Sequence, residues 1–141
     1  MTTIAWDGKS IVADKQATSG HLKVKTTKLV KLKNGWIAGF AGSLSEARVV
    51  EVWLNQGADR ETKPTVENLS VMMVSPDGRE VYEMEEQLEL FQIEGKFHAI
   101  GSGERYAIMA MHLGKTAREA VKLTSKYDPY TGLGVTEFKL R

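Results

Sequence analysis

The sequence predicts an α+β domain in which antiparallel sheets pack together and are covered by helices. Two tight-turn dipeptides, Asp7-Gly8 and Asn34-Gly35, each join two apolar segments, which is typical of β-hairpins. Helical spacing occurs only near the middle of the chain and close to its end. Helices grouped between blocks of strands favour stacked sheets with helices outside them. A chain of 141 residues is expected to form one domain, 1–141.

The first half of the chain is mainly strand. Strands are predicted at residues 2–6, 9–13, 22–32 and 36–41, on either side of the two turns. A helix is predicted over 43–55, where Leu44, Ala47 and Leu54 recur at helical spacing, and Gly57 ends it. The polar segment 57–68 is predicted to be a loop.

The second half combines strands with two helices. Further strands are predicted at 69–74, 79–84, 88–93 and 96–100, with turns at 75–78 and 94–95. Two helices follow at 104–113 and 117–126, separated by Gly114, and 135–140 is the last strand.

Composition excludes several classes of protein. The chain has 19 Lys and Arg against 18 Asp and Glu, so a nucleic-acid partner is not expected, although residues 22–33 are locally basic. It has no cysteine, and its three histidines lack ligand spacing, so neither a metal nor another cofactor is expected. The sequence lacks an apolar run of membrane-spanning length and a signal-peptide pattern, which predicts a cytoplasmic protein without a membrane contact.

One lysine is a candidate functional residue. Five lysines lie between Lys23 and Lys33, and four of them occupy odd positions. Lys28 instead shares the even positions with apolar residues, so strand alternation predicts that it lies on the apolar face. A lysine in that setting needs a partner or a function, and a structural ion pair satisfies the pattern as well as a catalytic role does.

The N-terminal hairpin supplies two further candidates. A two-residue turn pairs Thr2 with Ala13, so Asp14 is expected within about one residue of Thr2 and can partner the lysine. Removal of Met1 would give Thr2 a free amine beside its hydroxyl, which is a nucleophile with its own base. Each feature alone also fits an ordinary turn aspartate and an ordinary chain start.

The start of the helix at 43–55 can bind an anion. Ser43 and Glu46 fit a capping box, and the free amides of the first turn attract negative charge. Gly42 allows backbone to approach a ligand closely, so the segment can form an oxyanion hole. An ordinary helix start explains it equally well.

Six short motifs follow one another along the chain in the same order as in a known protein family. They are Thr2-Thr3-Ile4, Val12-Ala13-Asp14-Lys15-Gln16-Ala17-Thr18, Lys28-Leu29-Val30-Lys31-Leu32, Ile37-Ala38-Gly39-Phe40-Ala41-Gly42-Ser43, Ala99-Ile100-Gly101-Ser102-Gly103 and Asp128-Pro129-Tyr130-Thr131-Gly132. Together they resemble the proteasome β-subunit family of N-terminal nucleophile hydrolases, especially its HslV branch.

The resemblance implies an αββα four-layer sandwich of two antiparallel sheets between helical layers. It also implies a ring-shaped homo-oligomer that cleaves protein or peptide substrates and often works with a separate unfolding ATPase. Residues 57–68 are too few for the second long helix that the family has there. One helical layer is therefore expected to be reduced.

The resemblance also implies catalytic roles. Thr2 would attack a peptide carbonyl, Lys28 held by Asp14 would supply positive charge, and Ser102 would help to move the proton. The Gly42 amide would hold the oxyanion.

Further residues would support these groups. Asp128 and Thr131, which replaces the family's serine, would orient Ser102 and the amine of the nucleophile. Phe40 and Leu44 would line the pocket for the residue before the scissile bond. The implied activity is that of a threonine-type endopeptidase. A non-catalytic ring or scaffold protein and a small-amide hydrolase of the same fold remain alternatives, the first favoured if Met1 is retained.

Overall fold

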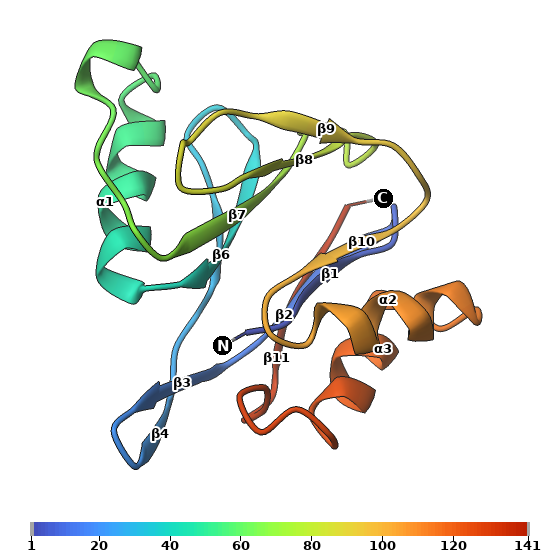
Figure 1. The fold of residues 1–141 in the computed structure, drawn as a ribbon. Helices are drawn as coiled ribbons and strands as arrows, with labels where there is room; N and C mark the ends of the chain where they lie inside the picture. Colours follow the sequence, from blue (N-terminus) through green and yellow to red (C-terminus); the bar gives the residue numbers. More distant parts are fainter. Residues whose placement is uncertain (1, 141) are drawn as a thin grey trace.

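Two antiparallel sheets form the centre of the computed structural model, which describes residues 2–140 (Figure 1). The first sheet has the strand order β10-β1-β2-β11, formed by His98–Ile100, Ile4–Trp6, Ser10–Asp14 and Val135–Lys139. The second has the order β5-β6-β7-β8-β9, formed by Leu29–Lys31, Ile37–Gly42, Leu69–Val74, Val81–Met84 and Phe91–Ile93. All strand pairs within both sheets are antiparallel, as predicted.

Strand alternation packs the two sheets against each other. Ile4 and Trp6 of β1 belong to the same buried cluster as Met72 and Val74 of β7. Ala5, which lies between them in sequence, belongs to a cluster on the opposite face of the sheet. The first sheet is therefore buried on both faces.

Helices cover the outer face of each sheet (Figure 1). Helix α1 (Leu44–Asn55) packs on the second sheet through Val50 and Trp53. Helices α2 (Glu104–His112) and α3 (Ala117–Thr124) cover the first sheet. This arrangement confirms the predicted αββα sandwich.

The helical layer over the second sheet is reduced, as predicted. Among the described residues, α1 is the one α-helix on that side, and the 57–68 segment holds only the short 3₁₀ turn Arg60–Thr62 (η1). None of the helices in residues 2–140 is long and apolar enough to span a membrane.

The first hairpin differs from its prediction. Trp6 pairs with Ile11 instead of Lys9, and the Asp7 N–H donates to the Ser10 carbonyl at 3.2 Å, so the pairing register is shifted by two residues. Asp7 Oδ1 accepts hydrogen bonds from the N–H groups of Lys9 (2.9 Å) and Ser10 (2.8 Å), which favours the observed turn. The pairing of every residue in this hairpin shifts accordingly.

The single strand predicted over 22–32 is wrong. β4 (Leu22–Lys25) pairs with the unpredicted β3 (Gln16–Ser19) in a separate hairpin, and the chain enters the second sheet only at β5. Leu22 and Val24, on the predicted apolar face, are 68% and 45% exposed. The alternation argument therefore fails for this segment, although Lys28 is buried.

Two other turns differ in detail. The N–H of Leu32 donates to the Trp36 carbonyl at 2.7 Å, so the second hairpin has a three-residue loop that ends at Gly35, with φ +92°. The turn at 94–95 does not join neighbouring strands, because β9 pairs with β8 whereas β10 pairs with β1. The chain crosses there from one sheet to the other.

Candidate active site

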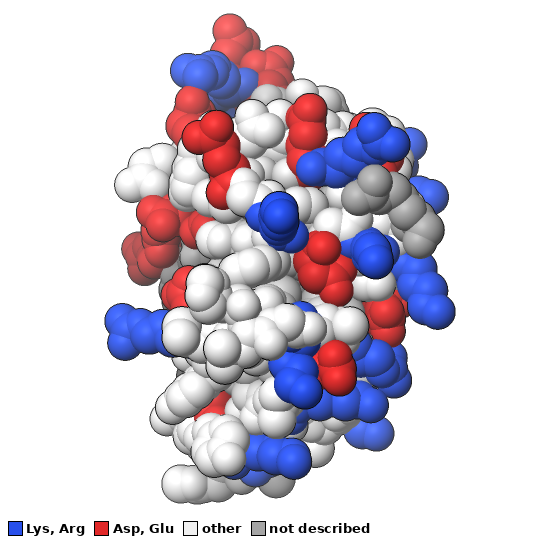
Figure 2. Space-filling view, turned by 90° about the vertical axis from the view of Figure 1, so that its right-hand side faces the viewer, with Lys and Arg blue, Asp and Glu red and all other residues white. Residues whose placement is uncertain are grey.

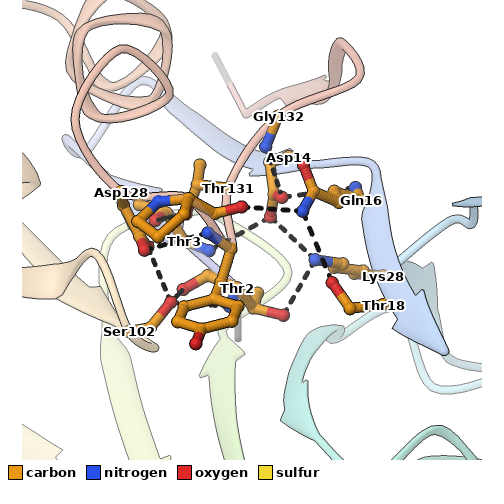
Figure 3. Close-up of polar contacts among 12 residues, drawn as sticks. Thr2, Thr3, Asp14, Gln16, Thr18, Lys28, Ser102, Asp128, Thr131 and Gly132 are labelled. Atoms are coloured by element: carbon orange, nitrogen blue, oxygen red, sulfur yellow. Dashed lines mark hydrogen bonds and ion pairs between the residues drawn. The ribbon is translucent and has the colours of Figure 1, made fainter. Parts of the chain in front are cut away.

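Thr2 is buried immediately before β1, where two groups from distant segments contact it. Its Oγ1 accepts a hydrogen bond from Lys28 Nζ at 2.8 Å. Its backbone nitrogen donates to Ser102 Oγ at 3.1 Å. Figure 3 shows the lysine and the serine on different sides of the threonine. The hydroxyl and the nitrogen of one residue thus have separate polar partners.

Lys28 forms a buried ion pair with Asp14. Lys28 Nζ lies 2.8 Å from Asp14 Oδ1, and the two side chains are only 2% and 1% exposed. Burial lowers the pKa of Lys28 from its ordinary value, and the charge of Asp14 opposes that effect. The ion pair keeps a positive charge beside the Thr2 hydroxyl.

The Asp14 carboxylate is fixed by four donors. Its Oδ1 accepts from Lys28 and from the N–H of Thr3 at 3.1 Å. Its Oδ2 accepts from the N–H groups of Gln16 at 3.2 Å and Gly132 at 3.0 Å. These bonds hold the end of β2 against the N-terminus and against the loop before β11 (Figure 3).

A second carboxylate lies behind Ser102. Asp128 Oδ2 accepts from Ser102 Oγ at 2.7 Å and from Thr131 Oγ1 at 2.6 Å. Burial raises the pKa of Asp128, but the hydrogen bonds from Thr131 and Ser102 outweigh it and hold that pKa below its ordinary value. Asp128 is therefore ionised at neutral pH and connects the serine to the loop that carries Thr131.

The Gly-Ser-Gly element at 101–103 packs closely against the N-terminal residues. A Cβ on Gly101 would lie 2.0 Å from the Thr2 carbonyl oxygen. A Cβ on Gly103 would lie 2.1 Å from Thr3 Oγ1. Both glycines are required for Ser102 to approach Thr2 so closely.

Gly42 ends β6 at the start of α1, with φ +122°. A Cβ there would lie 2.3 Å from the Asn68 carbonyl oxygen, so backbone packing alone requires glycine. The predicted capping box is half formed: Ser43 Oγ accepts from the Glu46 N–H at 3.3 Å, but the Glu46 carboxylate accepts from the N–H groups of Glu67 and Asn68. The oxyanion role of Gly42 stays a prediction.

A cleft of about 230 Å³ opens beside Lys28. Phe40 and Leu44 both line it, as do Ala47 and Glu51 of α1. Phe40 is buried, whereas Leu44 is 50% exposed. The cleft therefore has an apolar wall and is also lined by Lys28, which contacts Thr2.

Comparisons with known proteins agree with this architecture. Neither a protein-family model nor a curated protein matches the sequence. The structure of eukaryotic HslV from Trypanosoma brucei, 22% identical, aligns with a TM-score of 0.70 over 97% of each chain. The chain has the HslV fold.

Two further structures share this fold. BPH from Thiobacillus denitrificans, 19% identical, aligns with a TM-score of 0.73 over 99% of this chain and 98% of its own. The same protein in complex with epoxomicin, 18% identical, aligns with a TM-score of 0.72 over the same shares. At these identities the likeness establishes the HslV fold for the whole chain.

Sequence reasoning missed three residues that form hydrogen bonds in this polar cluster: Thr3, Gln16 and Gly132. Thr3 lies opposite Asp14, so Asp14 is within one residue of Thr2 as predicted, although the pairing register differs by two residues from the expected one. Within residues 2–140, clusters of His, Asp and Glu suited to a metal ion do not occur.

Proposed function

We propose that the chain belongs to the HslV and proteasome β-subunit family and is an N-terminal threonine peptidase. One observation carries the proposal: Thr2 Oγ1 lies 2.8 Å from Lys28 Nζ, while Thr2 N lies 3.1 Å from Ser102 Oγ. When Met1 is removed, this nitrogen becomes a primary amine beside the hydroxyl. Met1 itself lies outside the described residues.

The reaction needs one nucleophile and one proton carrier. Thr2 Oγ1 forms a bond to the carbonyl carbon of a peptide, and its proton passes to the Thr2 amine. The amine then gives the proton to the leaving nitrogen as the peptide bond breaks. Water hydrolyses the resulting ester by the same route in reverse and frees the threonine hydroxyl.

Lys28 favours the attacking form of the hydroxyl. A positive charge at hydrogen-bond distance stabilises developing negative charge on Thr2 Oγ1. Burial alone would favour neutral lysine, so Asp14 is needed to keep the ammonium charged. The ion pair is thus electrostatic support for the nucleophile.

Ser102 and Asp128 orient the amine. An ionised carboxylate has no proton to give, so Ser102 donates its own proton to Asp128. A lone pair of Ser102 Oγ is then directed at the nitrogen of Thr2, which matches the observed contact. Thr131 secures the other side of Asp128.

Substrate binding is assigned to the cleft and to Gly42. The Gly42 amide would hold the oxyanion, and donors of this kind contribute roughly 2.7–4 kcal/mol in a well-studied case. Phe40 and Leu44 would contact the side chain before the scissile bond, which favours apolar or small residues there.

We further propose that a ring-shaped homo-oligomer in the cytoplasm encloses these sites and receives substrates from an unfolding ATPase. Figure 2 shows a broad uncharged area over the side of the molecule that carries α2 and α3. Tyr106, Met109, Leu113 and Tyr127 are all more than half exposed there, and the two tyrosine rings stack at 6.3 Å. Large exposed apolar groups of this kind mark protein contacts.

The experiment is an intact-mass measurement before and after treatment with epoxomicin, which is bound to BPH in one of the compared structures. Loss of one methionine and a single adduct are expected, and Thr2→Ala should keep its fold, form no adduct and cleave no peptide. Unchanged peptide hydrolysis by Thr2→Ala would refute the mechanism.

Other outcomes separate the alternatives. Retained Met1, a stable oligomer and no turnover of any peptide would indicate a scaffold protein. Hydrolysis of a small amide without cleavage of peptides would indicate an amidase.

A further inference from the structure

Thr3 connects the two carboxylates of the site. The residue is 0% exposed, so it cannot touch a substrate. Its backbone N–H donates to Asp14 Oδ1, the same oxygen that accepts from Lys28. Its hydroxyl lies 2.7 Å from the hydroxyl of Thr131, which in turn donates to Asp128.

Counting protons fixes the direction of this hydroxyl chain. Thr131 has one hydroxyl proton, and it is used at 2.6 Å on the ionised Asp128. The contact between Thr3 and Thr131 therefore needs the proton of Thr3, so Thr3 donates and Thr131 accepts. A hydroxyl that accepts a hydrogen bond becomes a stronger donor, because bonds in a chain polarise one another.

We propose that Thr3 is a positioning residue, whose hydroxyl holds Asp128 through Thr131 in the orientation that directs Ser102 at the Thr2 amine. The proposal rests on the proposed function, since it assigns a role in preparing Thr2 as the nucleophile. Thr3 acts through other groups and does not contact the reacting atoms.

The packing around Thr3 keeps its hydroxyl in place. The space that a Cβ on Gly103 would take is filled by Thr3 Oγ1, at 2.1 Å, and by Thr124 Cγ2, at 2.3 Å. The Thr3 carbonyl also accepts from the Asp14 N–H at 3.1 Å, which fixes the backbone. With the backbone and the surroundings both fixed, the hydroxyl stays directed at Thr131.

The test compares Thr3→Val with Thr3→Ser, in full-length protein, by the rate of epoxomicin labelling and by peptide hydrolysis across pH. Valine keeps the shape and removes the donor. Loss of one ordinary hydrogen bond corresponds to about tenfold in rate, so Thr3→Val should label and turn over about tenfold more slowly, mainly through kcat. Thr3→Ser keeps the donor and should restore most of the rate.

The pH profile separates positioning from a general structural defect. A weaker bond from Thr131 raises the pKa of Asp128, so Thr3→Val should lose activity at higher pH than the unmodified protein on the acid side. Thr136→Val is the matched control, because among the described residues the Thr136 hydroxyl is buried without a hydrogen-bond partner. It removes a buried hydroxyl from β11 of the same sheet and should change neither rate nor profile.

Three results would overturn the proposal: an unchanged rate in Thr3→Val, an equal loss at every pH, or a loss of equal size in Thr3→Ser. Failure of the proposed function is distinguishable, because the unmodified protein would then form no adduct at all. The role of Thr3 could in that case still be tested by measuring the pH at which each variant unfolds in acid. Thr3→Val should unfold at a higher pH than Thr136→Val. Equal acid unfolding of these two variants would refute the link to Asp128.

Discussion

Lys28 Nζ lies 2.8 Å from Thr2 Oγ1, although the two residues are 26 positions apart and precede strands of different sheets. The contact depends on how the segment before β5 docks. The N–H of Phe40 donates to the Lys28 carbonyl at 3.0 Å, which holds the lysine backbone against β6. Asp14 then directs the ammonium to the N-terminus.

Replacing Lys28 by methionine should abolish the reactivity of Thr2. The variant loses the positive charge beside the hydroxyl, so epoxomicin labelling and peptide turnover should fall at least about 100-fold. It should also lose about 3–5 kcal/mol in free energy of unfolding, because Asp14 is left buried without its counter-charge. The rates of epoxomicin labelling and peptide turnover measure the first effect, and chemical denaturation measures the second.

Two further variants keep that experiment decisive. Lys31→Met alters an exposed lysine of β5 and should match the unmodified protein in both measurements. Lys28→Arg retains the charge and should fold, but a planar guanidinium does not reproduce the position of the ammonium, so labelling should stay reduced. Full labelling of a folded Lys28→Met protein would disprove the role of the charge.

The lowered pKa of Asp128 predicts how the stability of the protein depends on pH. Its folded pKa lies below the ordinary value of 3.8, because Thr131 and Ser102 donate to its ionised form. A group with a depressed folded pKa stabilises the fold above the unfolded pKa, and that stabilisation is lost as pH falls through the folded pKa. The unmodified protein should therefore exceed Asp128→Asn in free energy of unfolding by a constant amount above about pH 5, and this difference should shrink below about pH 4.

Urea denaturation of both proteins from pH 3 to pH 7 tests this expectation, because this interval includes the ordinary carboxylate pKa of about 4. A difference that grows towards acid pH would have the wrong sign and would exclude an ionised Asp128 in the folded state.

Local sequence patterns were sufficient to predict regular helices and strands such as β7, α2 and α3. β7 has the predicted bounds, Leu69–Val74, and the helices at Glu104–His112 and Ala117–Thr124 lie within the predicted ranges. Alternation, helical spacing and capping residues act over a few positions, so a single sequence carries them. The antiparallel sheets followed from the tight turns in the same way.

The sequence-based predictions failed where contacts between residues far apart in the sequence determine the local structure. The register of the first hairpin is shifted where Asp7 Oδ1 accepts from the Lys9 N–H, and the Asp7 carboxylate also caps α3 by accepting from the Ala117 N–H at 2.8 Å. That contact spans 110 positions and is invisible to local turn rules. Lys28 was correctly expected to be buried, but for a wrong reason, since docking on β6 and Asp14 buries it rather than strand alternation.

Thr116 should contribute to stability without affecting the site. Its side chain accepts from the Glu119 N–H at 3.1 Å, and the Glu119 carboxylate accepts from the Thr116 N–H at 3.0 Å, so α3 begins with a complete capping box. Thr116→Ala should lower the free energy of unfolding by about 1 kcal/mol and leave the labelling rate unchanged. Thr65→Ala, at an exposed loop position, is the control and should be neutral in both assays. A slower labelling rate in Thr116→Ala would show that the α3 cap and the site are coupled.

Leu44 tests whether the cleft beside Lys28 selects substrates. It lines that cleft and is 50% exposed, so Leu44→Glu should fold normally while placing a negative charge on the apolar wall. Peptides with an apolar residue before the scissile bond should show a KM about tenfold higher, whereas peptides with lysine or arginine there should gain, because opposite charges attract within the cleft. Val49→Glu is the matched control, since Val49 lies on the same helix at 51% exposure and does not line the cleft. A peptide panel assayed with both variants decides the question: a change in preference confined to Leu44→Glu assigns the cleft to the substrate side chain, and the same change in both variants, or in neither, excludes it.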